Sequence, residues 1–199
     1  PSRDPLKFGV FFFDYDLDGR LDLLTVNGHL EEEIAKIQHG QKYRQSAQLY
    51  WNGGDAGFVS VGADAAGKDL FQSIVGRGSA FADVDGDGDL DVVFTQLGGA
   101  PMLLRNDQQL GHAWVRVRLV GKAGNPEALG ASVRLKAGGR NQWRTQTTTR
   151  SYLSSSEAVL TFGLGSAREI EELEVVWPDG TRQTVTGATA GKVITVRQP

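Results

Sequence analysis

One nine-residue pattern occurs twice and constrains the fold of this chain more than any other feature. GVFFFDYDLDGRLDLL, residues 9–24, aligns with GSAFADVDGDGDLDVV, residues 78–93, and both contain D-x-D-x-D-G-x-L-D. Six identical positions in a nine-residue window indicate an internal repeat. Apolar runs that favour β-strands flank both copies, so the sequence predicts two acidic loops held between strands.

The spacing of the aspartates predicts a cation site in each loop. Ca²⁺ takes about 6–8 oxygen ligands, and carboxylates at positions 1, 3 and 5 of a tight loop converge on one point. Glycine at position 6 permits the sharp turn because it adopts positive φ at low cost. Position 7 offers a backbone carbonyl, position 8 a core leucine and position 9 a closing carboxylate. The predicted ligands are Asp14, Asp16, Asp18, Arg20 (carbonyl) and Asp22 in the first loop, and Asp83, Asp85, Asp87, Asp89 (carbonyl) and Asp91 in the second.

Other interpretations of the acidic loops stay open on the residues alone. An EF-hand needs glutamate at position 12 and flanking helices, and neither loop has them. The carboxylates could form a solvated turn without an ion, or a pair for glycoside hydrolysis. Mg²⁺ prefers fewer protein ligands and more water, so two Ca²⁺ sites are the favoured hypothesis.

The charge distribution predicts two domains. Residues 1–110 contain 17 acidic and 9 basic side chains, a net charge of −8, while residues 111–199 contain 7 and 12, a net charge of +5. Such a break in composition indicates a boundary near Gly111, giving domains 1–110 and 111–199. The 26 glycines and the short apolar runs predict an all-β chain. The absence of cysteine excludes disulfides and thiolate metal sites.

The basic half alternates apolar and polar residues along about seven segments, which predicts a small antiparallel β-sandwich. The predicted strands are 114–120, 133–136, 142–150, 158–162, 170–177, 182–186 and 192–197. Trp177-Pro178-Asp179-Gly180 has the residues of a hairpin turn with glycine in the left-handed conformation.

Basic side chains of these strands are predicted to share one exposed face. They are Arg116, Arg118, Arg134, Lys136, Arg144 and Arg150. The face could stay solvated or bind an anionic partner: an acidic glycan, another protein, or the acidic repeats themselves. Nucleic acid is not expected, because no recognition motif or row of stacking aromatic residues accompanies the charges.

Motifs for catalysis and membrane insertion are missing from the sequence. His29, His39 and His112 are far apart, and no nucleophile elbow or P-loop occurs, so an enzyme is not predicted. The sequence has no run of about 18 apolar residues, so no membrane span is predicted. The insert at residues 29–46 is predicted as a surface loop or as a short helix with Leu30, Ile34 and Ile37 along one stripe.

The repeat motif FADVDGDGDLD resembles FG-GAP/VCBS-type β-propeller repeats. The segments GHAWVRVRLVG, LGASVRLKAGG, YLSSSEAVLTFGLG and LEVVWPDG of the basic half resemble the ASPIC/UnbV domain. Residues 149–151 depart from that pattern, which tends to have glycine before Tyr-Leu-Ser.

The resemblance implies a fold of two propeller-type blades with calcium loops, followed by the β-sandwich. It also implies a secreted, periplasmic or cell-surface protein with a calcium-bearing adhesion, scaffold or binding role and no established enzymatic activity. Two repeats cannot close a propeller, which uses about 4–8 blades, so they are expected to pair with further blades or neighbouring subunits. The alternatives are an accessory C-terminal part of a larger enzyme and a structural subunit of a multichain assembly.

Overall fold

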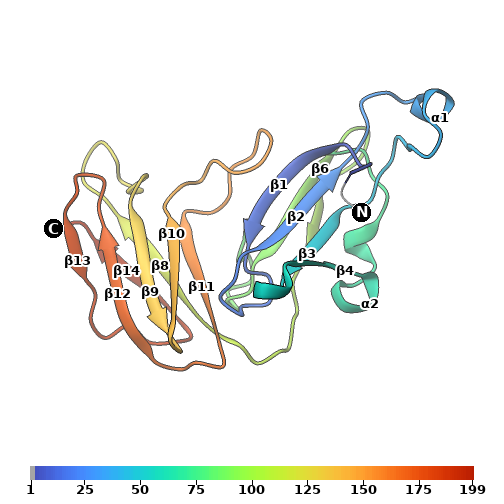
Figure 1. The fold of residues 1–199 in the computed structure, drawn as a ribbon. Helices are drawn as coiled ribbons and strands as arrows, with labels where there is room; N and C mark the ends of the chain where they lie inside the picture. The colour runs from blue at the N-terminus through green and yellow to red at the C-terminus, as the bar shows by residue number, and fades with distance from the viewer. Residues whose placement is uncertain (1–2) are drawn as a thin grey trace.

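The computed structural model describes residues 3–199 and consists almost entirely of β-strands (Figure 1). Two sheets from the N-terminal half lie beside two sheets from the C-terminal half, and a single segment around residue 110 joins the halves. The predicted all-β class is confirmed.

The first acidic loop joins the first two strands of a four-stranded antiparallel sheet. The sheet order, β1-β2-β3-β4, follows the order of the strands in the chain. A four-stranded meander of this kind is the form of one propeller blade. The strands are β1 (Lys7–Phe13), β2 (Asp22–Asn27), β3 (Gln48–Asn52) and β4 (Phe58–Val61).

The second acidic loop joins the first two strands of a three-stranded sheet. Its strands, β5 (Gly76–Ala82), β6 (Asp91–Gln96) and β7 (Met102–Leu104), pair in chain order. The two sheets share one core, which includes Phe11, Phe13, Phe81 and Phe94. Neither sheet closes on itself within residues 3–199, so a complete propeller stays a prediction.

Helical segments of the N-terminal half are short. They are α1 (Ile34–Ile37), α2 (Ala63–Ala66) and the 3-10 turns η1 (Gly54–Ala56) and η2 (Asp69–Phe71). The insert does form a short helix, but only Ile34 is buried, while Leu30 and Ile37 are 69% and 68% exposed. The predicted apolar stripe is therefore wrong, because α1 projects away from the sheets and offers one residue to them (Figure 1). No helix among residues 3–199 has the length and apolar character needed to cross a membrane.

The C-terminal half forms two sheets around a core of its own, which includes Val117, Leu135, Phe162 and Trp177. The sheet orders are β10-β9-β12-β13 and β11-β8-β14. The strands are β8 (Ala113–Val120), β9 (Ser132–Ala137), β10 (Arg140–Thr145), β11 (Val159–Gly165), β12 (Ile170–Val176), β13 (Arg182–Thr184) and β14 (Lys192–Arg197).

One strand pair of this sandwich differs from the antiparallel prediction. β14 pairs with β8 in parallel, since the chain leaves β13 in one sheet and crosses to the other before it pairs. Parallel neighbours require such a crossover connection. The predicted turn after Trp177 is confirmed, with Gly180 at φ +86° and the Trp177 N–H donating to the Thr181 carbonyl at 2.8 Å.

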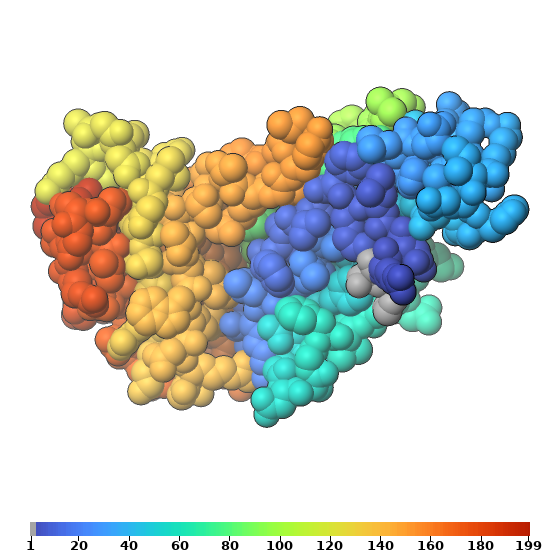
Figure 2. Space-filling view, turned by 45° about the horizontal axis from the view of Figure 1, so that its top comes forward, coloured from blue at the N-terminus to red at the C-terminus, as the bar shows by residue number. Residues whose placement is uncertain are grey.

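Strand β10 ends at Thr145 rather than continuing to Arg150. The chain then leaves the sandwich and reaches over the N-terminal half before it returns as β11 (Figure 1). In the space-filling view this orange segment lies directly against the blue N-terminal strands (Figure 2). The two halves are therefore in contact through a loop as well as through the joining segment.

Candidate metal centre

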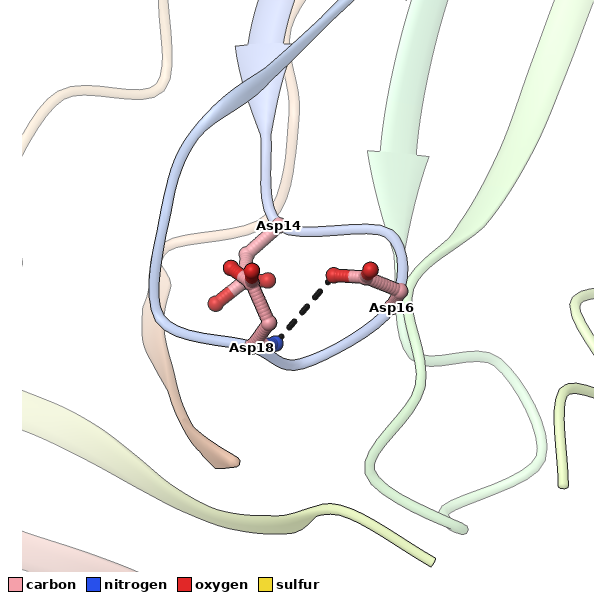
Figure 3. A group of neighbouring side chains, drawn as sticks. All are labelled: Asp14, Asp16 and Asp18. Carbon is pink, nitrogen blue, oxygen red and sulfur yellow. Dashed lines mark hydrogen bonds between the residues drawn. The ribbon is translucent and has the colours of Figure 1, made fainter. Parts of the chain in front are cut away.

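The first acidic loop brings three carboxylates together. Oxygens of Asp14, Asp16 and Asp18 all lie within 4.8 Å of one another. Figure 3 shows their side chains turned toward one another inside the loop, with the Asp18 N–H donating to Asp16 Oδ1 at 3.2 Å. The predicted convergence of positions 1, 3 and 5 is thus present in the structure.

Asp14 is the most deeply placed member of this cluster, with 1% of its surface exposed. Its Oδ2 accepts the N–H groups of Gly19 at 2.9 Å and Gly163 at 3.1 Å, while its Oδ1 is buried without a hydrogen-bond partner. Burial raises the pKa of Asp14 to about 8, although Arg144 nearby acts in the opposite direction. A buried, unpaired carboxylate oxygen is costly unless a cation or a donor reaches it, so Oδ1 fits a metal ion.

The aspartates at position 9 lie at the base of the loops. Both oxygens of Asp22 and both oxygens of Asp91 accept backbone N–H groups, and neither residue belongs to the three-carboxylate clusters. The donors are Tyr15 and Asn52 for Asp22, and Val84 and Asn106 for Asp91. The structure thus shows these carboxylates bracing one loop against the end of β3 and the other against the segment that follows β7, and their ligand role stays a prediction. Burial raises the pKa of Asp22 to about 7.

The residues at position 7 act differently in the two loops. The Arg20 N–H donates to Asp18 Oδ1 at 2.7 Å, and its guanidinium pairs with Asp18 Oδ2 at 2.5 Å. Asp89 has a buried side chain that accepts Gln108 Nε2 at 2.9 Å, and burial raises its pKa to about 6. The predicted carbonyl ligands at these two positions stay predictions.

The second acidic loop also brings its first three aspartates together, within 4.8 Å. Asp85 and Asp87 are exposed, and only Asp83 lies against the sandwich. Asp83 Oδ1 accepts the Gly86 N–H at 2.7 Å, and its Oδ2 accepts the Gly88 N–H at 3.1 Å. Both oxygens of the first aspartate are therefore satisfied here, unlike those of Asp14.

Arg116 of the sandwich is buried against the second loop. Its Nη1 donates to Asp83 Oδ2 at 2.6 Å, its Nη2 pairs with Glu157, and its Nε donates to Thr161 at 3.1 Å. Arg144 is also largely buried, 3.9 Å from Asp14. Arg150 lies over the Phe81 ring, 5.7 Å from its centroid, so the acidic repeats contact three of the six basic residues.

The prediction of one exposed basic face is wrong. Arg116 and Arg118 lie in one sheet, whereas Arg134, Lys136 and Arg144 lie in the other. On the second sheet, Arg134 pairs with Glu172, and Lys136 pairs with Glu171 at 2.8 Å. The physical reason is that these strands divide between the two sheets of the sandwich, while docking of the halves buries Arg116 and Arg144.

Leu17 is the residue of the first loop that sequence reasoning missed. It has φ +58° and no exposed surface, and its carbonyl accepts the Gly165 N–H of β11 at 2.9 Å. The equivalent position in the second loop is Gly86, with φ +83° and open space beside it. A large apolar residue where the other copy has glycine was the available signal, and it marks the loop that packs against the sandwich.

The segment 151–157, which we call the serine strap, attaches the sandwich to two edge strands. Serine hydroxyls accept N–H groups of β1 and β5 that no sheet neighbour uses, and this protects the strand edges. The bonds are Val10 to Ser151 (3.0 Å), Ser79 to Ser154 (3.0 Å) and Phe81 to Ser156 (3.2 Å). Ser151 has φ +68°, which explains why the resemblance expects glycine in this region.

Two family models match the chain. Residues 32–94 match the FG-GAP-like repeat, and residues 121–199 match ASPIC and UnbV. The first match begins after the first acidic loop and ends within β6, so it includes the second loop. The chain therefore carries an FG-GAP-like repeat followed by an ASPIC and UnbV domain, as the resemblance predicted. No curated protein matches the chain.

Proposed function

We propose that this chain is a calcium-binding scaffold or adhesion module, with one Ca²⁺ in each acidic loop. The observation that carries the proposal is Asp14 Oδ1, which is buried without a donor beside the carboxylates of Asp16 and Asp18. The clustered ligands are oxygens alone, a set that suits a hard cation such as Ca²⁺ rather than zinc or copper. The bound ion would supply the positive charge that these carboxylates share.

The proposal includes the setting in which the module acts. We place it outside the cytoplasm, in a secreted, periplasmic or cell-surface protein, with a non-enzymatic role. Support comes from the extracellular type of repeat and binding module that the FG-GAP-like and ASPIC and UnbV matches suggest. Calcium sites of extracellular modules work at about 10⁻⁴–10⁻³ M, a range that open loops such as the second one suit. We also propose 1–110 and 111–199 as the two domains, because their cores share no residue.

Calorimetry tests the calcium proposal directly. Titration of metal-free protein with CaCl₂ should show two ions bound per chain. Each site stabilises the native state by about 2.7 kcal/mol when free Ca²⁺ is 100 times its Kd. At about 2–4 °C per kcal/mol, Tm should rise by about 5–10 °C per saturated site between EDTA and Ca²⁺.

Magnesium at the same concentration is the control, and its effect should be much smaller. Coincident melts in EDTA and in millimolar Ca²⁺, together with no binding heat, would contradict the proposal. A protein that responds equally to Mg²⁺ and Ca²⁺ would contradict the assignment of the ion.

A further inference from the structure

The sandwich donates to the same carboxylate oxygen in both loops. In the first loop the Gly163 N–H lies 3.1 Å from Asp14 Oδ2, and in the second Arg116 Nη1 lies 2.6 Å from Asp83 Oδ2. That oxygen also accepts the N–H of the glycine at position 6 of its own loop, at 2.9 and 3.1 Å. The other oxygen, Oδ1, has no hydrogen-bond partner in Asp14, whereas in Asp83 it accepts the Gly86 N–H at 2.7 Å. A single feature of the aspartate at position 1 thus connects each loop to the second half of the chain.

We propose that metal binding by the loops and docking of the sandwich are one linked equilibrium, in which Gly163 and Arg116 position the first carboxylate of each metal site. The inference rests on the proposed calcium function. Donors that hold a ligand's outer atoms orient it, and their loss typically weakens metal affinity about 10- to 100-fold. Linkage is reciprocal, so the ion must strengthen docking by the same factor by which docking strengthens its binding.

The first loop fits the sandwich closely. A Cβ on Gly163 would overlap both Asp14 Oδ2 and the backbone of Leu17, so only glycine permits this approach. The sandwich also contacts the loop backbone: Arg140 Nη1 donates to the Asp18 carbonyl at 2.9 Å, and His112 Nδ1 lies 2.6 Å from the Asp16 carbonyl. The loop and the β11 edge therefore fix each other's position.

The second loop has its own attachment to the sandwich. A Cβ on Gly88 would overlap the indole ring of Trp114, which lies against the loop. The Asp83 N–H donates to Glu157 Oε1 at 3.2 Å, and Glu157 in turn pairs with Arg116. The sandwich thus holds both the backbone and the side chain of the aspartate at position 1.

The contact between the halves is separate from both cores. The buried cluster of the N-terminal half and that of the sandwich have no residue in common. The halves meet at the acidic loops and at the serine strap. Removal of the ions should consequently loosen the docking while both cores stay folded.

Hydrogen exchange on the intact chain measures the docking. The reporting amides are Gly163 and Gly165, which donate to the first loop, and the reference amide is Leu135 in the sandwich core. Exchange at the two glycines should be at least about 5-fold faster in EDTA than in Ca²⁺, the lower end of typical coupling. Exchange at Leu135 should change much less.

Calcium titration of Gly163→Ala tests the reverse direction. We expect the calcium affinity of the first-loop site to fall about 10- to 100-fold, while that of the second stays the same. The matched control is Gly62→Ala, because Gly62 has negative φ and open space around it. Leu17→Gly is a second variant, which removes a fully buried side chain of the loop without changing any aspartate and should weaken the same site.

Each outcome decides between the two proposals. Two bound ions in the wild type, with equal Gly163 exchange in EDTA and Ca²⁺ and unaltered affinities in Gly163→Ala and Leu17→Gly, overturn the linkage and leave the calcium function intact. No calcium bound by the wild type overturns both. Faster exchange in EDTA together with weaker binding in both variants supports the linkage.

Discussion

The two acidic loops have one motif and two environments. Asp14 and Asp16 of the first loop are 1% and 6% exposed, whereas Asp85 and Asp87 of the second face solvent. The difference follows from the sandwich, which contacts the first loop from Asp14 to Gly19 and the second at Asp83 and Gly88. A repeated sequence therefore does not give a repeated site, because the neighbouring domain sets the burial of each copy.

The same comparison predicts that the first loop depends on a bound ion more than the second loop does. Asp14 Oδ1 has no donor, while the equivalent oxygen of Asp83 accepts the N–H of Gly86. The second loop closes on itself through this bond, and the first does not. We expect the first loop to bind calcium more tightly and the second loop to exchange its calcium ion with solvent faster.

The largest effect should come from the buried arginine at the base of the second loop. Arg116→Met leaves Asp83 and Glu157 as neighbouring carboxylates without their cation, and breaking a buried pair costs about 3–5 kcal/mol. Arg118→Met, on the same face of β8 but exposed, should change stability by less than about 0.5 kcal/mol. Urea unfolding in saturating Ca²⁺ measures both. Equal effects would show that the base of the second loop is as open as its tip.

The next largest effect should come from replacing an aspartate of each loop by asparagine and comparing the unfolding free energies. In saturating Ca²⁺, Asp14→Asn should lower the unfolding free energy by about 2.7 kcal/mol, the contribution of a site at 100 times its Kd. Asp87→Asn should cost less, because the exposed loop binds its ion more weakly.

In EDTA the sign for Asp14→Asn should reverse. The raised pKa of Asp14 means that its charge is unfavourable in the metal-free fold, so the neutral amide should stabilise that state. Melts of both variants with and without Ca²⁺ provide the measurement. Equal calcium-dependent shifts for the two variants would remove the proposed difference between the loops.

Giving each loop the residue that the other has at position 4, Leu17 or Gly86, should have a moderate effect on stability. Loss of a buried leucine side chain costs about 2–5 kcal/mol, and relief of the left-handed backbone returns about 1–2 kcal/mol. Leu17→Gly should therefore destabilise by about 2 kcal/mol. Gly86→Leu has only the positive φ to oppose it and should cost about 1 kcal/mol, as measured by chemical unfolding. A larger cost at Gly86 would reverse the assignment of the packed loop.

The smallest effect is expected in the serine strap. Ser151→Gly removes the acceptor for the Val10 N–H and the partner of the Ser79 hydroxyl, together worth about 1–2 kcal/mol, but it also relieves a positive φ of similar cost. Stability should change by less than about 0.5 kcal/mol. Ser151→Ala loses both bonds and keeps the strain, so it should cost about 1–2 kcal/mol, and thermal unfolding measures both variants. If the glycine variant were the worse of the two, the hydroxyl would matter more than the backbone.

Local pattern was sufficient for the clustered aspartates and for most of the strands, although β10 ends at Thr145 rather than at Arg150. Alternation correctly separated Val115 and Val117 from Arg116 and Arg118, because period two is a property of the strand itself. Alternation could not predict which of Arg116 and Arg118 contacts the N-terminal half, because both side chains lie on the same face of β8. The burial of Leu17 and the parallel pairing of β14 were missed for a related reason: each depends on segments far away in the chain.

The position of β14 has a consequence for the order of assembly. β8, which carries Arg116, is the middle strand of its sheet, and its second neighbour is the last strand of the sandwich. During synthesis the N-terminal elements fold first, so both aspartate loops leave the ribosome before β8 can be completed. Throughout that interval the growing chain has the loops, with Arg20 beside Asp18 and Arg105 beside Asp85, but not their sandwich donors. Any further positive charge that gathers their carboxylates must then come from solution.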